Sequence, residues 1–182
     1  MGMGSKKQQG LGLRRGTVKL LSYRASWRAR FEREQRILKK SLGAKALDIQ
    51  HVGSTSIPGL SAKPIIDIAL GVKNLKVARA LRHPLEKLGY AFRPNAGGPY
   101  RLFFAKGPEA RRTVYLHVLR HRGSEWYKRI NFRDYLRTHS ATRNQYAALK
   151  KTLAKKFADE RPKYTAQKAA FIQKALRRAR PK

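Results

Sequence analysis

Apolar and polar positions change their spacing several times along the first half of this chain, and each change predicts a different element. Behind Ser26, an expected cap, apolar residues recur at three- and four-residue intervals, which favours a helix that Gly43 ends. Residues 46–52 alternate between apolar and polar side chains, as in a strand with one buried face. Residues 65–70 are apolar on both faces apart from Asp67, which is typical of an interior strand.

The second half of the chain continues this alternation and then becomes helical. The spacing predicts, in order, a helix capped by Asn74 that Pro84 kinks or divides, a short strand at 90–93, an antiparallel hairpin of 100–105 with 113–119, and helices at 125–137 and behind the caps Ser140 and Thr165. Strands and helices mixed in this way predict an α/β fold with a helical C-terminal section.

The composition fits one globular domain with basic ends. The 182 residues can bury about two-thirds of their unfolded surface around one core. We expect a basic flexible arm at 1–17, a domain at 18–178 and a basic tail at 179–182. The chain has no cysteine, which excludes disulfides and thiolate metal sites. It shows neither a long apolar segment nor a secretory signal, so we expect a cytoplasmic protein without membrane contact.

The charge of the chain is extreme. There are 43 Lys and Arg residues against 10 Asp and Glu residues, which gives a formal net charge of +33. Such a charge attracts polyanions. One candidate partner is therefore nucleic acid, held nonspecifically through its phosphates by the N-terminal arm and the C-terminal helices. The alternative is that the charge reflects a basic or salt-adapted proteome and not a partner.

The segment between the first two predicted strands has the chemistry of an anion site. Gly53 allows backbone to approach a ligand closely, and Ser54 and Thr55 supply hydroxyl donors. Lys63 adds a cation a few residues later. Together these groups predict a cradle for phosphate oxygens.

Asp67 places a carboxylate inside an apolar strand, where it needs a partner. One alternative is a basic side chain, such as Lys63 or Arg101. The other is functional: a ligand for a hard cation, or a general base at the end of the strand. Arg101 is then free to act as a phosphate clamp from the predicted hairpin.

Four segments share their pattern with one known family. They are YxxxWxxxFxxE from Tyr23, HVGSTSIPGLSAKPIIDI at 51–68, and YLHV from Tyr115 followed by NFRDYLR from Asn131. On these segments the chain resembles the GrpB family, whose fold belongs to the nucleotidyltransferase superfamily. The resemblance spans about residues 20–175, and it implies a nucleotidyltransferase-like mixed β-sheet flanked by helices.

The resemblance also implies a site, from which this chain departs. Nucleotidyltransferases carry a Gly-Ser pair on a turn, then a strand with two carboxylates one residue apart, which hold metal ions on nucleotide phosphates. Gly53-Ser54 and Asp67 match that pattern and imply a Mg²⁺ ligand at Asp67. The second carboxylate position is Ala69, which cannot bind a cation. At the third position we expect His117, as an acid or base or as a hydrogen-bonded structural residue.

Three functions remain open. The first is an altered catalytic site that transfers a nucleotidyl or other phosphorylated group. The second is a pocket that binds a nucleotide or a phosphorylated small molecule without catalysis. The third is the nonspecific binding of nucleic acid. The resemblance also implies a link to nucleotide or coenzyme metabolism, because members of the GrpB family are found joined to dephospho-coenzyme A kinase.

Overall fold

The computed structural model describes residues 11–14 and 16–179. Short 3-10 helices occur at Gly43–Lys45 (η1), Ser54–Ser56 (η2) and Pro94–Ala96 (η3). The other elements are β1 (Leu13–Arg14), α1 (Ser26–Leu42), β2 (Asp48–Val52), β3 (Ile66–Val72), α2 (Leu75–Ala80), α3 (Arg82–Lys87), β4 (Tyr90–Phe92), β5 (Arg101–Lys106), β6 (Arg111–Arg112), β7 (Val114–Arg120), α4 (Ser124–Thr138), α5 (Ser140–Lys156), α6 (Arg161–Gln167) and α7 (Ala169–Arg178). None of the described helices is long and apolar enough to cross a membrane.

The central sheet has five strands in the order β2-β3-β7-β5-β4. β3 and β7 lie side by side in parallel, whereas the other neighbours pair antiparallel. The predicted mixed sheet is therefore confirmed, as is the antiparallel pairing of the hairpin strands. The interior position of β3 also explains why its sequence is apolar on both faces.

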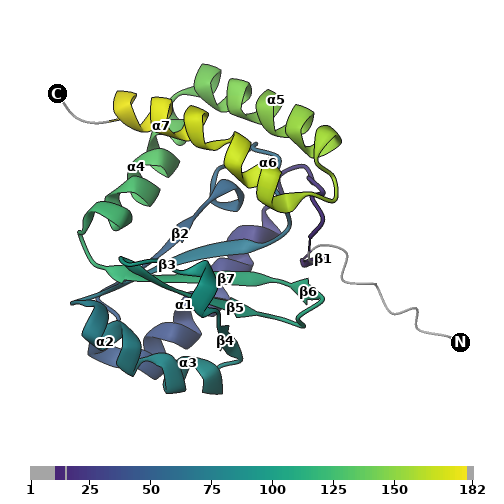
Figure 1. Cartoon of the computed structure of the whole chain (residues 1–182). Coiled ribbons are helices and arrows are strands. Elements are labelled where there is room, and N and C mark those ends of the chain that lie inside the picture. Colours follow the sequence, from purple (N-terminus) through teal and green to yellow (C-terminus); the bar gives the residue numbers. More distant parts are fainter. Residues whose placement is uncertain (1–10, 15, 180–182) are drawn as a thin grey trace, which may run out of the picture.

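The two faces of the sheet are covered by different helices. Helices α1, α2 and α3 lie against one face, and α4 to α7 lie over the other (Figure 1). Alternate residues of β3 and β7 point into the α1–α3 layer and form the main core, including Ile66, Ile68, Val114 and Leu116. The intervening residues, including Asp67, point toward the C-terminal helices. This alternation places the predicted carboxylate under a helical cover.

The helices form where they were predicted, but several of them do not begin with the predicted capping residue. Asn74 caps α2 as expected, because its side chain accepts a hydrogen bond from the Val77 amide at 3.0 Å. A second short helix, α3, carries Pro84 in its first turn, as one of the two alternatives predicted. Ser26 and Ser140 begin their helices without capping hydrogen bonds from a side chain. Thr165 is not a cap either, because it lies inside α6.

The predicted N-terminal arm is partly built into the fold. Leu13 is buried, and β1 pairs with β6. The amide of Gly12 donates to the carbonyl of Pro64 at 2.7 Å. Two backbone pairings and a buried leucine thus connect this part of the predicted arm to the domain, and the division into arm, domain and tail stays a prediction. Residues 1–10 of the arm and 180–182 of the tail lie outside the described residues.

A buried carboxylate joins α1 to the far edge of the sheet. Glu34 is 1% exposed and accepts hydrogen bonds from the Tyr90 hydroxyl at 2.8 Å and from the Lys106 ammonium at 2.9 Å. Arg30 lies 3.0 Å from its other oxygen. Burial and the neighbouring Glu34 charge raise the pKa of Tyr90. The three partners satisfy a charge that would otherwise be costly to bury.

Replacing Glu34 with Ala is expected to destabilise the protein strongly, because it leaves Lys106 and Tyr90 without their shared partner. The expected loss in unfolding free energy is about 2 to 4 kcal/mol. Glu32→Ala is the matched control: Glu32 lies in the same helix and pairs with the largely exposed Arg28, so it should cost less than about 1 kcal/mol. Urea unfolding of both variants measures the difference. Equal losses would contradict a structural role for Glu34.

Candidate functional site

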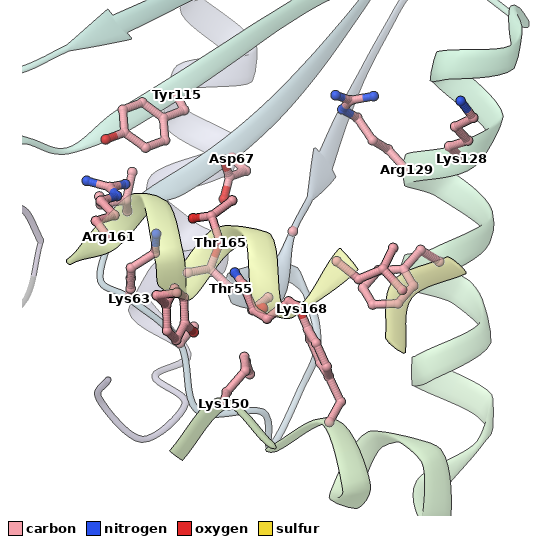
Figure 2. Close-up of a pocket in the computed structure, with 18 of the residues that line it drawn as sticks. Thr55, Lys63, Asp67, Tyr115, Lys128, Arg129, Lys150, Arg161, Thr165 and Lys168 are labelled. Carbon is pink, nitrogen blue, oxygen red and sulfur yellow. The ribbon is translucent and has the colours of Figure 1, made fainter. Parts of the chain in front are cut away.

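A cavity of about 480 Å³ lies between the sheet and the C-terminal helices. The η2 turn and the ends of β3 and β7 form its floor, and side chains of α4 to α7 form its walls. Figure 2 shows Lys63 and Arg161 on one side of it and Lys128 and Arg129, from α4, on the other. Gly53, Ser54, Thr55, Lys63 and Asp67 all line this cavity, so the structure brings these five predicted residues together.

Gly53 is needed for the packing of the turn against β3. Its φ is +70°, in the left-handed region, and a Cβ at this position would lie 2.7 Å from Oδ2 of Asp67. Such a distance excludes a side chain unless the structure shifts. The sequence predicted that Gly53 leaves space for a ligand, whereas the atom that occupies this space belongs to Asp67.

Asp67 is oriented by a chain of hydrogen bonds from behind. Nε2 of His117 lies 3.3 Å from Oδ1 of Asp67, and Nδ1 of the same ring lies 3.1 Å from a guanidinium nitrogen of Arg101. Because arginine can only donate, Nδ1 must accept, and in a neutral ring the proton lies on Nε2 and points to Asp67. Burial lowers the pKa of His117, although Asp67 opposes the shift. A neutral, singly protonated His117 follows.

The carboxylate of Asp67 is ionised in this arrangement. Burial disfavours its charged form, but the hydrogen bond from His117 and the positive charges of Lys63 and Arg161 outweigh burial and lower the pKa. The side chain is 31% exposed, and it lines the cavity. Asp67 therefore presents a fixed negative charge to whatever occupies the cavity.

The structure places His117 and Arg101 elsewhere than the predicted roles require. Neither residue lines the cavity. His117 lies behind Asp67, and Arg101 is engaged by His117 and by the carbonyls of Ala96 and Gly97, at 2.6 and 3.0 Å. A phosphate clamp at Arg101 and an acid or base at His117 do not fit this geometry. Both residues instead position Asp67, whose direct partner is His117 and not the expected Lys63 or Arg101.

The C-terminal helices supply basic residues that the sequence analysis missed as site residues. Together with Lys63 they give the cavity six cationic side chains: Lys63, Lys128, Arg129, Lys150, Arg161 and Lys168. Asp67 is the one carboxylate in this lining. In a chain with 43 Lys and Arg residues, no local pattern separates these cations from the solvated ones, because only the packing of α4 to α7 brings them together.

Several of these cations form no direct ion pair with a described residue. Lys128 and Arg129 pair with Glu125, at 2.7 and 3.0 Å. Within the described part of the chain, Lys63, Lys150, Arg161 and Lys168 form no ion pair with a carboxylate. Lys150 donates to the carbonyl of Ser61, and the ammonium groups of Lys63 and Lys168 lie 5.5 and 4.2 Å from the centre of the Tyr164 ring.

The chemistry of these lysines follows from their surroundings. Burial, and after it the charge of neighbouring cations, lowers the pKa of Lys63 and of Lys150 to about 7 in each case. Burial likewise lowers the pKa of Lys168 to about 8. Close, partly buried and uncompensated positive charges are stabilised by a multiply charged anion.

A family model described as GrpB protein matches residues 17–178 of the chain. The chain belongs to the GrpB family. It is 35% identical over 170 residues to the glutamate-rich protein GrpB of Alkalihalophilus pseudofirmus, with 91% of this chain and 98% of that protein covered. The predicted family is thus confirmed.

A crystal structure and a longer relative extend this comparison. GrpB from Enterococcus faecalis has a TM-score of 0.81 and 35% identity, over 88% of this chain and 96% of that one. A dephospho-CoA kinase of Mycolicibacterium paratuberculosis is 29% identical over 194 residues, but only 46% of its length is matched. The GrpB fold is therefore shared, and it also forms part of a larger protein.

The site of this GrpB protein does not fit a resident Mg²⁺. That ion prefers an octahedral set of oxygen ligands, and Asp67 is the one carboxylate among the lining residues. Among the described residues there is no group of three or more His, Cys, Asp or Glu that could hold a metal. Ala69, fully buried beside Asp67, occupies the place of a second carboxylate. The predicted Mg²⁺ at Asp67 lacks its other protein ligands.

The lowered pKa values predict how stability depends on pH. Lys63 has a pKa of about 7 in the folded chain and an ordinary value of 10.5. Between these values the unfolded chain binds more protons, so the unfolding free energy rises with pH. Lys63→Met removes this contribution. We expect the variant to be more stable than wild type near pH 7, and the difference to shrink toward about pH 10.

Urea unfolding across this pH range tests the expectation. Lys151→Met, at an exposed position of α5, removes the same charge outside the cavity and should keep the wild-type slope. Parallel pH profiles of wild type and Lys63→Met would contradict the assignment of a destabilising ammonium at Lys63.

Proposed function

We propose that this GrpB-family protein binds a phosphorylated small molecule in the cavity, with a nucleotide as the foremost candidate. The observation that carries the proposal is a set of cavity cations without an ion-pair partner among the described residues, around the single carboxylate of Asp67. Lys150 is buried, and Lys63, Arg161 and Lys168 are half-buried. A polyphosphate supplies several negative oxygens within the span of one small ligand, and it would compensate these charges together.

The turn contributes hydrogen-bond donors to the same ligand. Ser54 and Thr55 line the cavity, and Oγ1 of Thr55 lies 3.0 Å from Nε2 of His51. His51 stacks on Phe31, with ring centroids 4.8 Å apart. Burial lowers the pKa of His51 to about 4, so this ring is neutral at physiological pH and leaves the charge in the cavity unchanged. The Ser54 hydroxyl thus complements the lysines as a neutral donor to phosphate oxygens, and the Thr55 hydroxyl joins it in the His51 tautomer in which Nε2 donates to Oγ1.

The second candidate function is the transfer of a nucleotidyl or other phosphorylated group, and the position of Asp67 supports it. An ionised carboxylate that faces an anion-binding cavity repels phosphate and accepts hydrogen bonds, so it suits an incoming hydroxyl group and not the phosphates themselves. In that role it would orient an acceptor hydroxyl and take its proton. The name of the mycobacterial relatives, dephospho-CoA kinase, supports nucleotide and coenzyme A precursors as the ligands to try first.

Binding is tested with tripolyphosphate and ATP in the presence of EDTA. We expect both to raise the melting temperature, and calorimetry to show binding that does not need a divalent ion. Lys63→Met should weaken tripolyphosphate binding about tenfold or more, because it removes one charged hydrogen-bond donor. Lys151→Met should bind as wild type does. Equal weakening in both variants would point to general attraction by the basic surface, and no binding at all would refute the proposal.

Transfer is tested by incubating the protein with nucleoside triphosphates and divalent ions, and by following the release of pyrophosphate or phosphate. If Asp67 takes the proton of an acceptor, Asp67→Asn should abolish turnover while tripolyphosphate still binds. Tight binding by wild type without turnover across the nucleotides would leave the protein a binding module.

A further inference from the structure

A groove of about 790 Å³ lies between α4 and α7, outside the cavity described above. Figure 1 shows α7 crossing α4 where the two helices meet. The groove is lined by Ser124, Tyr127, Lys128, Asn131, Thr165, Ala169, Ile172, Gln173, Leu176 and Arg177. Most of these side chains are uncharged.

The groove continues from the cationic cavity. Four residues line both spaces: Lys128, Thr165, Ile172 and Leu176. They come from α4, α6 and α7. A ligand bound at the cavity lysines that extends past these four side chains would reach the space between α4 and α7. The two spaces are therefore neighbours: the cavity is lined by six cationic side chains, and the groove is mostly uncharged, with Lys128 and Arg177 as its charged residues.

The chemistry of the groove differs from that of the cavity. Tyr127 is an aromatic residue with 45% of its surface exposed, which leaves its ring available for stacking. The amides of Asn131 and Gln173 come from opposite helices, α4 and α7, and offer both donors and acceptors. Ile172 and Leu176 add apolar surface. An aromatic face, amides and aliphatic side chains suit a flat or extended group that is uncharged and can form hydrogen bonds.

We propose that the groove binds the uncharged arm of the phosphorylated ligand, either a nucleobase with its ribose or an amide-containing chain. The ligand would place its phosphates over Lys63, Lys150 and Lys168 and its neutral arm between Tyr127 and α7. This inference rests on the proposed function, and it assigns a second recognition site that would select among phosphorylated compounds.

The experiment compares ligands with and without the neutral arm. Wild type should bind ATP more tightly than tripolyphosphate, because ATP carries the arm in addition to the phosphates. Tyr127→Ala should weaken ATP binding about tenfold, as expected for the loss of one stacking contact, and it should leave tripolyphosphate binding unchanged. Coenzyme A carries both kinds of arm, so its affinity is compared with that of ATP and of 4′-phosphopantetheine, which has the amide chain without a nucleobase, to tell which arm the groove prefers.

A second variant blocks the groove and leaves Lys63, Lys150 and Lys168 unchanged in sequence. Ala169, at the start of α7, is exposed and lines the groove, so Ala169→Trp should fill it and weaken the binding of ATP or coenzyme A alone. Ala170→Trp is the matched control: Ala170 is also exposed but does not line the groove. Both are surface positions, and the retained tripolyphosphate binding reports that the variants fold.

The outcomes separate this inference from the proposed function. If wild type binds tripolyphosphate, ATP and coenzyme A with equal affinity, the neutral arm site is overturned and the anion cavity stands. The arm site is also overturned if Tyr127→Ala and Ala169→Trp bind ATP and coenzyme A as wild type does. Failure of tripolyphosphate, ATP and coenzyme A to bind would overturn both proposals.

Discussion

The close contact between Gly53 and Asp67 is the constraint on which the site depends. Oδ2 of Asp67 fills the volume that a Cβ at position 53 would need, so the turn lies directly on the end of β3. The turn then carries Ser54 and Thr55 into the cavity wall. On its other side, Asp67 is held by His117, which Arg101 fixes in one tautomer. A carboxylate, a turn and a sheet strand thus form one rigid floor.

The walls of the cavity are costly to the free protein. Burial first, and neighbouring cations after it, lower the pKa values of Lys63, Lys150 and Lys168, so keeping these ammonium groups charged costs free energy in the folded protein. Stability must come from elsewhere, chiefly from the core between the sheet and α1 to α3 and from the fully partnered Glu34. The core thus stabilises the fold, whereas the clustered cations of the cavity destabilise it. This combination is expected where a bound ligand stabilises the cavity.

Local patterns in the sequence predicted the elements well but their ends poorly. The apolar run around Asp67 and the cap at Asn74 were identifiable because each depends on neighbouring residues alone. Thr165 was mistaken for a cap because its type suits one, whereas the helix begins earlier, at Arg161, with a proline in its first turn. The contacts of the N-terminal segment were equally hidden from local patterns, because the partners of Leu13 and Gly12 lie far away in the sequence.

The sequence by itself determined the family, the mixed α/β fold and the floor of the site, because the segment 51–68 holds Gly53, Ser54, Thr55, Lys63 and Asp67 within one turn and one strand. Only the tertiary structure decided what surrounds them. The parallel pairing of β3 with β7 puts His117 opposite Ala69 and behind Asp67, which makes it a positioning residue. The packing of α4 to α7 selects five more cations from a strongly basic chain. Both results depend on contacts between distant segments, which composition and local spacing do not encode.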